Sequence, residues 1–201
     1  MGIALNKTTL KSQRDQAKTY KQFLPSLELR RQQLLAALKK SRLELLAIEA
    51  RIEELRVRLE PLYPLLGSST IPTLTTTSLV KVRAVRIETE NMVGTKVPVV
   101  REIDFEVAEY WPLATPFWFD HLIDNLRHMT RLRVEHQVGQ RRVEALELAA
   151  RRVTQRVNLF EKVLIPRAED NIRRIVIFLS DQERAAVVRS KISKRKRASE
   201  D

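Results

Sequence analysis

The sequence contains no cysteine, few glycines and few aromatic residues, and these shortages exclude several classes of function. Without cysteine, the chain can form no disulfide, no thiolate nucleophile and no cysteine-containing zinc site. Four glycines among 201 residues is well below the average usage of about 7%. Their positions (2, 67, 94 and 139) fit neither of the glycine-rich motifs that cradle phosphates in Rossmann and P-loop proteins, so autonomous nucleotide chemistry of either kind is excluded.

The sequence also lacks a hydrophobic run that could enter a membrane. Its longest uncharged stretch, residues 61–80, holds three prolines, one glycine and eight serines or threonines, which would leave backbone polar groups unpaired in lipid. Residues 1–10 show no apolar core of a signal peptide. We therefore expect a linker at 61–80, no signal peptide and no direct membrane insertion.

Basic residues, in contrast, are plentiful. The chain carries 37 Lys or Arg against 25 Asp or Glu, which gives a formal net charge of +12. An excess of this size favours an anionic partner, which could be a nucleic acid, an anionic lipid surface or an acidic protein surface. Charge alone does not choose among the three.

The first third of the chain has the hydrophobic spacing of a long coiled-coil helix. From Ala17 onward, apolar residues step alternately by three and four positions over six heptads, and charged residues occupy the other faces. Because proline removes a helical N–H donor, Pro25 predicts a kink or a short break between Lys21 and Pro25, and the unbroken heptad register favours a kink. The seam consists of Ala17, Tyr20, Leu24, Leu27, Arg31, Leu34, Leu38, Ser41, Leu45, Ile48, Ile52, Leu55, Leu59 and Leu62.

After residue 79 the hydrophobic spacing changes to two, which predicts a β-hairpin. Apolar residues alternate over 80–84, and the alternation changes phase at Ala84/Val85, which indicates a β-bulge there. A second run alternates over 103–107 after a loop at 91–94. Basic residues of the first strand would then face acidic residues of the second, namely Lys81, Arg83 and Arg86 against Glu102, Asp104 and Glu106.

Aromatic residues gather between the hairpin and the next helix. Five of the eleven fall within residues 110–119, a segment without Lys or Arg. A packed core where hairpin meets helix is therefore favoured over a stacking platform for bases or a ligand. The five are Tyr110, Trp111, Phe117, Trp118 and Phe119.

A second long heptad seam starts near Pro116, where proline suits the first turn of a helix. Across Pro166 the seam slips by one residue, which predicts a local change of supercoil and not the end of the helix. The seam consists of Leu122, Asn125, Met129, Leu132, His136, Gly139, Val143, Leu146, Ala150, Val153, Val157, Phe160 and Leu164, then Ile172, Ile175 and Leu179.

These patterns predict an all-α dominated fold, a long antiparallel two-helix coiled coil with a small β-hairpin insertion between the helices. We place an N-terminal coiled-coil helix at 1–62, a linker, hairpin and aromatic cap at 63–116, a C-terminal coiled-coil helix at 117–193, and a basic, disordered tail at 194–201. Folding two such helices back on each other brings both termini to one end.

The sequence offers no arrangement of residues for catalysis or metal binding. His121, His128 and His136 are separated by about 10 to 12 Å along a helix axis, too far to share one ion. Carboxylates are spread along the helices, where they favour solvated ion pairs, and no nucleophile has an activating base beside it. We therefore assign no catalytic, cofactor-binding or metal-binding residue and interpret the chain as non-catalytic.

Two parts of the chain resemble a known family. The C-terminal helix signature of the D subunit of V-type and archaeal-type ATPases is closely matched by Thr154, Gln155, Arg156, Val157 and Asn158, followed by Ile165, Pro166 and Arg167. The start is similar as well, in residues 5–10 and in the basic pair Arg30-Arg31 between leucines, and residues 24–27 look like the bacterial branch of the family. The order of parts and the length also match.

The resemblance implies a central rotor stalk, the shaft that couples ATP hydrolysis or synthesis to ion (proton or sodium) transport, with no cofactor of its own. In that family the paired terminal helices lie inside the ring of catalytic A and B subunits. The middle end of the shaft meets the F subunit and the adaptor subunit (C or d) of the membrane ring. The implied location is cytoplasmic, peripheral on the membrane-bound complex, with no nucleic acid as partner. We expect the ring interface to include Lys7, Leu10, Lys11, Arg14, Arg173, Arg174, Phe178, Arg184 and Arg189.

Two other interpretations stay open. A basic coiled coil that binds RNA or DNA would explain the net charge, although the sequence lacks interleaved aromatic and basic residues and any recognised nucleic-acid motif. A cytoskeletal or scaffold coiled coil would explain the heptads, although it explains neither the hairpin nor the match over residues 154–174.

The two seams predict an elongated particle in solution. Residues 3–60 and 117–193 as helices would measure ~87 and ~115 Å. Small-angle X-ray scattering of the isolated chain should therefore give a radius of gyration of about 30 Å or more. A radius of ~16 to 18 Å, as for a compact chain of this length, would contradict the antiparallel coiled coil.

Overall fold

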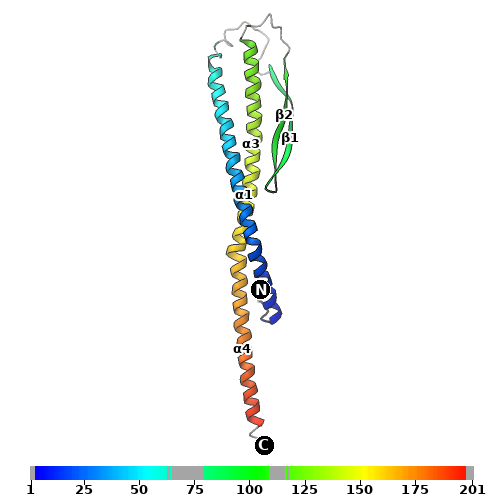
Figure 1. The fold of residues 1–201 in the computed structure, drawn as a ribbon, viewed down its shortest axis with the longest axis vertical. Helices are drawn as coiled ribbons and strands as arrows, with labels where there is room; N and C mark the ends of the chain where they lie inside the picture. Colours follow the sequence, from blue (N-terminus) through cyan, green and yellow to red (C-terminus); the bar gives the residue numbers. More distant parts are fainter. Residues whose placement is uncertain (1–2, 63, 65–78, 109–115, 117, 198–201) are drawn as a thin grey trace. The chain divides into compact units, whose positions relative to one another are not determined.

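Helices and one antiparallel hairpin make up the computed structural model, which describes residues 3–62, 64, 79–108, 116 and 118–197. The expected fold class, two long helical stretches with a β-hairpin between them, is confirmed (Figure 1). Residues 63 and 65–78, most of the expected linker, lie outside the described residues. So do Tyr110, Trp111 and Phe117 of the aromatic segment. The elements are α1 (Lys7–Leu59), the short 3-10 turn η1 (Glu60–Leu62), β1 (Val80–Met92), β2 (Thr95–Val107), α3 (Phe119–Leu159), the π-helical turn η4 (Phe160–Leu164) and α4 (Ile165–Arg197).

The chain divides into two compact units, each built on a different stretch of α1. The terminal unit comprises Met1–Arg31 and Arg152–Asp201, and the middle unit comprises Gln32–Arg151. The terminal unit therefore pairs the first part of α1 with α4, whereas the middle unit pairs the second part of α1 with α3 and includes the hairpin.

Asn6 sets the start of α1. The Thr9 N–H donates to Asn6 Oδ1 at 2.7 Å and the Leu10 N–H donates to Asn6 O at 3.0 Å. A side-chain acceptor at this position satisfies an N–H group that has no helical partner in the first turn. From there α1 runs continuously to Leu59 with Pro25 inside it, so the short break considered near Pro25 does not occur.

The predicted seam of α1 is buried along its length. Every seam position from Ala17 to Leu59 is buried or half-buried, whereas the intervening positions are almost all exposed. In the middle unit, Leu55 and Leu59 form a core cluster with Leu132 of α3. Because full burial of a leucine side chain contributes about 1.5–3 kcal/mol, this seam is the main source of pairing energy.

Polar contacts between the helices show that both pairings are antiparallel. In the middle unit Arg42 pairs with Glu147, Glu44 Oε2 with Arg142 at 3.0 Å, and Glu49 Oε1 with His136 Nε2 at 2.9 Å, so residue numbers rise on α1 as they fall on α3. The terminal unit repeats the pattern: Lys7 to Glu183 at 3.8 Å, Gln13 to Asn171 at 3.1 Å and Lys21 to Glu169 at 2.6 Å. Largely exposed pairs of this kind each contribute at most about 1 kcal/mol, so they fix the register more than the stability.

Small and polar seam residues of the middle unit have specific surroundings. A Cβ atom added at Gly139 would lie 3.1 Å from Leu45 Cδ1, so glycine allows the two helices to approach closely there. Asn125 Nδ2 donates to the His121 carbonyl at 2.7 Å. Ser41 is only 4% exposed, and its Oγ has no hydrogen-bond partner among the described residues. The seam therefore tolerates a buried hydroxyl that has no hydrogen-bond partner among the described residues.

The one-residue slip of the second seam corresponds to the π-helical turn η4. The Ile165 N–H donates to the Phe160 carbonyl, five residues back, so the turn holds one residue more than an α-helical turn. Pro166 follows directly and cannot donate to the carbonyl four residues before it, which a wider turn accommodates. The helix does not end here, because α4 continues to Arg197.

The hairpin differs from the sequence prediction in its irregularities. The register shifts twice, between Val82 and Ala84 and between Arg86 and Ile87, so Arg83 and Arg101 are the extra residues and the predicted bulge at Ala84/Val85 is wrong by about one residue. Of the expected charge pairs, Lys81 lies opposite Glu106, and Arg86 lies opposite Glu102 with an ion pair at 3.1 Å, whereas Arg83 has no opposite residue. The strands continue to Met92 and resume at Thr95, so the loop is shorter than 91–94, with positive φ angles at Val93 (52°) and Gly94 (74°). Two consecutive residues with positive φ form a two-residue hairpin turn whose backbone twist matches the twist of the flanking strands.

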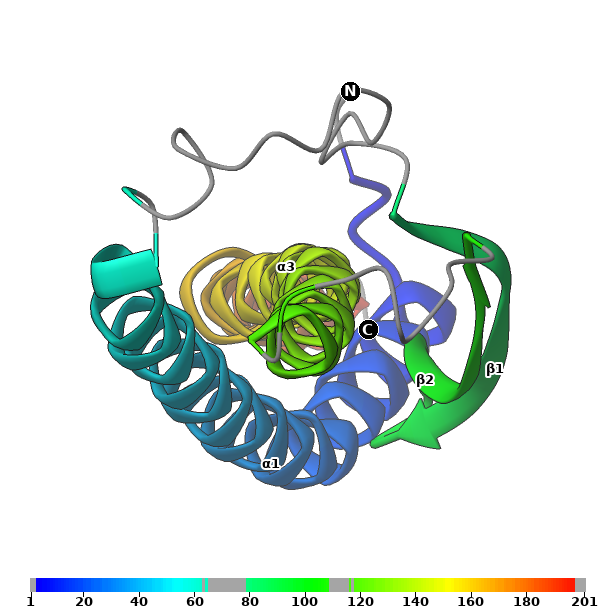
Figure 2. The ribbon, with the colours of Figure 1, turned by 90° about the horizontal axis from the view of Figure 1, so that it is seen from above.

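The base of the hairpin meets α3 in a second core cluster of the middle unit. Leu79, Phe119, Leu122 and Ile123 are buried together, with Val80, Val107 and Trp118 packed around them. For Trp118 and Phe119 the preferred interpretation of the aromatic segment, a packed core, is therefore confirmed. The hairpin lies alongside α3 in both views of the ribbon (Figures 1 and 2).

The helical C-terminus extends further than predicted. α4 ends at Arg197, whereas the sequence predicts a helix ending at 193 and a disordered basic tail from 194. Lysine and arginine are good helix formers, and cations at a helix C-terminus interact favourably with its dipole, which explains the extension through residues 194–197. Residues 198–201 lie outside the described residues.

The burial of two leucines of α3 predicts that their substitution by alanine lowers the free energy of unfolding to very different extents. Leu132 is fully buried against Leu55 and Leu59, whereas Leu148 is 49% exposed. We expect Leu132→Ala to lower the free energy of unfolding by about 2–5 kcal/mol, and Leu148→Ala to lower it by less than about 0.5 kcal/mol. Urea denaturation followed by circular dichroism measures both. Equal effects would contradict the assigned seam.

The two helical prolines also differ in context. Pro25 lies inside α1, where the missing N–H leaves a backbone carbonyl without its helical donor, whereas Pro166 follows the π turn at the start of α4. We expect Pro25→Ala to raise the free energy of unfolding by up to about 3 kcal/mol and Pro166→Ala to change it by less than about 1 kcal/mol. The same denaturation experiment compares them, and a larger gain from Pro166→Ala would argue against the role given to the π turn.

Candidate functional site

All nine residues of the predicted ring interface lie in the terminal unit. They come from the first turns of α1 and from α4, and all except the half-buried Leu10 are exposed. On α1 these are Lys7, Leu10, Lys11 and Arg14, and on α4 they are Arg173, Arg174, Phe178, Arg184 and Arg189.

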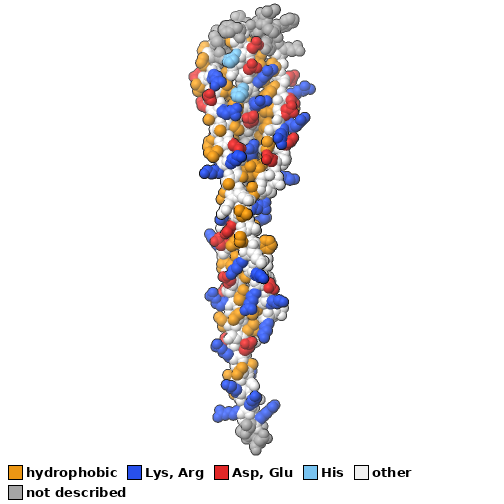
Figure 3. Space-filling view, in the orientation of Figure 1, with side chains coloured by type: hydrophobic (Ala, Val, Ile, Leu, Met, Phe, Trp, Pro, Cys, Tyr) orange, Lys and Arg blue, Asp and Glu red, His pale blue; other side chains and the backbone are white. Residues whose placement is uncertain are grey.

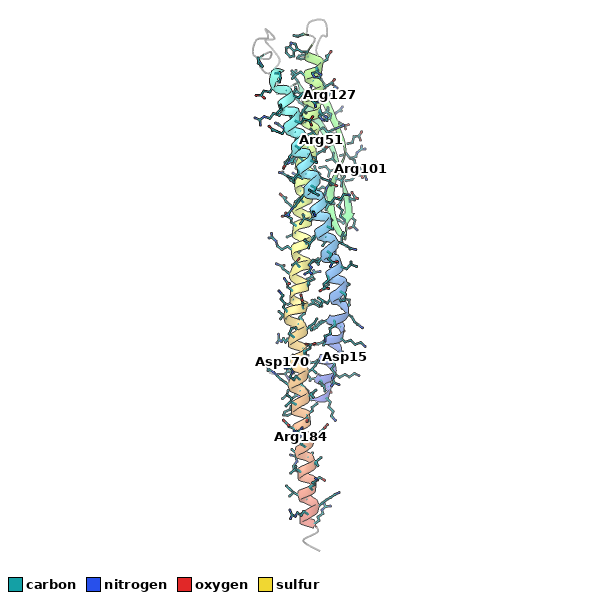
Figure 4. All side chains as sticks on the ribbon, turned by 60° about the vertical axis from the view of Figure 1, so that its left-hand side comes forward. Asp15, Arg51, Arg101, Arg127, Asp170 and Arg184 are labelled. Carbon is teal, nitrogen blue, oxygen red and sulfur yellow. The ribbon has the colours of Figure 1, made fainter. Side chains whose placement is uncertain are left out.

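Antiparallel pairing brings most of these residues to the same stretch of the terminal unit. The Gln13–Asn171 hydrogen bond and the Lys7–Glu183 ion pair mark two levels where α1 and α4 meet. Lys11 lies between these levels on α1 and Phe178 lies between them on α4. Figure 4 shows Asp15 of α1 and Asp170 of α4 at a similar height, with Arg184 further along α4. Arg184 and Arg189 follow Glu183, where α4 continues past the first residue of α1.

Several of the basic side chains make no ion pair among the described residues. Arg174 pairs with Asp170 at 2.8 Å, and Arg184 lies 3.9 Å from Asp181. Lys11, Arg14, Arg173 and Arg189 make no ion pair within the described ranges. A surface with uncompensated positive charge attracts an acidic counter-surface over a distance of about a Debye length, ~8–10 Å at physiological salt.

The last turns of α4 expose apolar side chains among the basic ones. Val187, Val188 and Ile192 are 55%, 55% and 53% exposed, and Ala185 is the only half-buried position from Arg184 to Arg195, a stretch whose side chains the structure describes throughout. Figure 3 shows hydrophobic side chains at the surface between those of Lys and Arg. Exposed apolar side chains that lie close together on one stretch of helix favour contact with another protein.

The signature residues flank the π turn on both sides. Val157 is fully buried and Thr154 and Ile165 are half-buried, so these three contribute to packing against α1. Next to them Phe160 meets Tyr20 of α1 edge to face, with ring centroids 5.4 Å apart and planes at 79°. Gln155, Arg156, Asn158, Pro166 and Arg167 are exposed and remain available to a partner.

A surface cleft of about 500 Å³ lies beside the signature in the terminal unit. Ile3 and Leu5 form one wall, and Arg167, Asp170 and Arg174 of α4 form another. No sequence pattern indicates this cleft, because it depends on where the residues before α1 lie. The interhelical ion pairs were also not predicted, since they require the exact register of the two helices.

The arrangement of the terminal unit suits binding. Nowhere in the described part of the chain do three or more His, Asp or Glu residues form a group that could hold a metal ion. Among the described residues, no helix combines the length and the apolar character needed to cross a lipid bilayer. What the unit offers is a charged and partly apolar protein surface on two firmly paired helices.

Comparison with known proteins identifies relatives along nearly the whole chain. The profile of a family described as the D subunit of ATP synthase matches residues 9–195. The V-type ATP synthase D subunit of Borreliella burgdorferi is 35% identical over 192 residues, which cover 96% of this chain and 93% of that protein. The proteins of the same name from Chlamydia muridarum and Chlamydia trachomatis serovar L2 are 31% and 32% identical, each over 96% of this chain and 95% of theirs.

The exposure of the basic residues predicts that their charge is dispensable for folding. A variant with Lys11, Arg14, Arg173 and Arg174 all changed to Glu loses one intrahelical ion pair, Arg174–Asp170, which contributes at most about 1 kcal/mol. We expect the isolated variant to keep its helical circular dichroism and to lose less than about 2 kcal/mol of unfolding free energy. Loss of helical structure at moderate salt would show that these side chains support the helix pair.

Proposed function

The chain belongs to the family of ATP synthase D subunits, and on this premise we propose that it is the central rotor shaft of a V-type ATP synthase or ATPase. In this role it is a non-catalytic subunit. Instead it couples ATP hydrolysis or synthesis in a ring of A and B subunits to ion translocation across the membrane. The observation that best supports this role is the exposed, basic and partly apolar surface of the tightly paired helices in the terminal unit.

The terminal unit contacts the A/B ring in this proposal. Its positive charge complements an acidic inner surface, and its exposed apolar residues supply contact area. Because α1 and α4 present different side chains, the surface is asymmetric around the helix axis. Such a surface stabilises different conformations of the ring subunits that face its different sides, and turning it shifts which conformation is favoured at each position.

Paired helices suit a part that must transmit torque. A single helix of this charge content is marginally stable and bends, whereas two helices locked by a buried seam resist sliding and twisting. In the terminal unit, buried Ala17, Ala168 and Ile175 belong to such a seam, and the Lys7–Glu183 and Lys21–Glu169 pairs fix its register.

The middle unit connects to the other rotor parts in this proposal. The F subunit and the adaptor subunit of the membrane ring are its partners, and the chain is located on the cytoplasmic side as a peripheral part of the membrane-bound complex. The nucleic-acid and scaffold interpretations account for the charge or the heptads alone. The proposed shaft accounts for both and for the signature around the π turn.

Reversal of charge in the terminal unit tests the proposal. Single exposed charges each contribute under about 1 kcal/mol, so we expect single substitutions to be tolerated. The variant with Lys11, Arg14, Arg173 and Arg174 changed to Glu should lose ring assembly or ATP-driven ion transport, measured in reconstituted vesicles. ATP hydrolysis alone is a poor readout, because an incomplete complex can hydrolyse ATP without transport.

A control variant separates the position of the charges from the net charge. Lys81, Arg131, Arg133 and Arg141 are exposed basic residues of the middle unit. Their change to Glu alters the net charge equally and should leave assembly with the A/B ring intact. Wild-type transport by the terminal-unit variant would show that its charge does not hold the shaft in the ring.

A further inference from the structure

Two buried polar atoms of the middle unit have no hydrogen-bond partner among the described residues. They are the hydroxyl oxygen of Ser41 on α1 and the Nε of Arg142 on α3. A polar group that is buried without a partner raises the free energy of the folded chain. Nearly all such groups in folded proteins are paired, some of them through an ordered water molecule. Both atoms therefore need a partner other than the side chains around them.

The two atoms lie at the same level of the helix pair. One turn after Ser41 on α1, Glu44 Oε2 accepts a hydrogen bond from Arg142 Nη1 at 3.0 Å. The next residue, Leu45, lies 3.1 Å from the position of a Cβ atom added at Gly139. Because the helices are antiparallel, a step back from 45 to 41 on α1 corresponds to a step forward from 139 to about 143 on α3. Arg142 thus lies within about one turn of Ser41.

The two atoms also lie on the same edge of the seam. Around α1, Ser41 lies about 20° from the fully buried Leu34, and Glu44 lies about 80° from it in the same direction. The ion pair with Glu44 draws the side chain of Arg142 over this edge. The Nε of Arg142 is therefore on the side of the seam where the Ser41 hydroxyl is buried.

The serine leaves room at this level. Its neighbours along the seam are Leu38 and Leu45, whose side chains each have two more heavy atoms than that of Ser41. A water molecule occupies about 30 Å³ in the liquid, which is less than the volume of the two missing carbon groups. Because Ser41 is only 4% exposed, this space is closed to bulk solvent.

We propose that a single water molecule is bound in the seam, where it accepts a hydrogen bond from Arg142 Nε and donates one to Ser41 Oγ. The charge at this level favours water over a small anion, because Glu44 already compensates the guanidinium of Arg142. This inference does not depend on the proposed function, since it concerns the folded chain alone.

The bound water fixes the register of α1 against α3. A shift of one helix along the other by a turn would separate the two polar atoms and bury each of them without a partner. The apolar side chains of the seam discriminate less between registers, since one can replace another after a shift. A single polar position in a coiled-coil seam can specify register in this way. Ser41 and Arg142 are thus positioning residues for the helix pair.

The sign of one substitution tests the proposal. If the Ser41 hydroxyl had no partner, Ser41→Ala would lower the equilibrium constant for unfolding, because it removes an unpaired buried group and alanine favours the helix. With the water in place, the substitution removes one of its partners. We then expect the unfolding constant to rise at least about threefold, measured by urea denaturation followed by circular dichroism. An unchanged or lowered constant would overturn the proposal.

A double-mutant cycle tests whether the two side chains share the water. Arg142→Lys keeps the positive charge opposite Glu44 and removes the Nε donor. In this background Ser41→Ala should change the unfolding constant by less than about twofold. Arg141→Lys is the matched control, because Arg141 is the exposed neighbour on α3, and in that background the effect should stay at least about threefold. Equal effects of Ser41→Ala in all backgrounds would show that no partner is shared and would overturn the proposal.

Crystallography of the full chain identifies the bound group. In crystals grown with bromide in place of chloride, we expect density for one water within hydrogen-bond distance of both atoms and no anomalous signal of bromine there. An anomalous peak at that position would identify a bound anion. Density for neither would show that the two atoms stay unpaired. Each of these two results would overturn the proposal.

Discussion

Burial of two heptad seams against each other is the interaction on which the rest of the structure depends. The helices are rich in charge, and helices of this kind are marginal in water until an apolar face is covered. Fully buried Leu34, Leu132 and Leu146 in the middle unit, and Val157 and Ile175 in the terminal unit, supply that cover. The exposed surfaces keep their geometry because these side chains lock each helix pair in one antiparallel register.

Much of this could be predicted from the sequence because the governing rule is periodic. The seam from Ala17 to Leu59, the hairpin and the one-residue slip near Pro166 are all readable from spacing. The spacing alone did not show that a π turn accommodates the slip, since a helix can accommodate an extra residue in several ways. The bulge at Arg83 was predicted about one residue from its place, and the bulge at Arg101 and the extension of α4 to Arg197 were missed, because they depend on strand register and on weak helix-end energetics. For the predicted ring interface, the structure gives the position and exposure of each residue, while its contacts stay a prediction.

The division of each helix into a buried face and free faces explains how one chain can form stable helix pairs and still present surfaces to partners. Its seams use one face of each helix and leave the others for partners. In the terminal unit those faces carry unpaired basic residues and the exposed valines of α4. Family membership explains why such surfaces are combined in one chain, since a shaft in this proposal must meet a ring of partners and further rotor subunits.

As the proposed rotor shaft, this chain turns as a unit when ATP is hydrolysed around it, and observation of single complexes tests this most directly. The change Glu90→Cys places the only thiol of the chain on the exposed end of the hairpin, where a bead can be attached while the A/B ring is fixed to a surface. We expect ATP to drive rotation of the bead in one direction and removal of ATP to stop it. Sustained ATP hydrolysis by complexes whose attached beads do not turn would contradict the role of a rotor shaft.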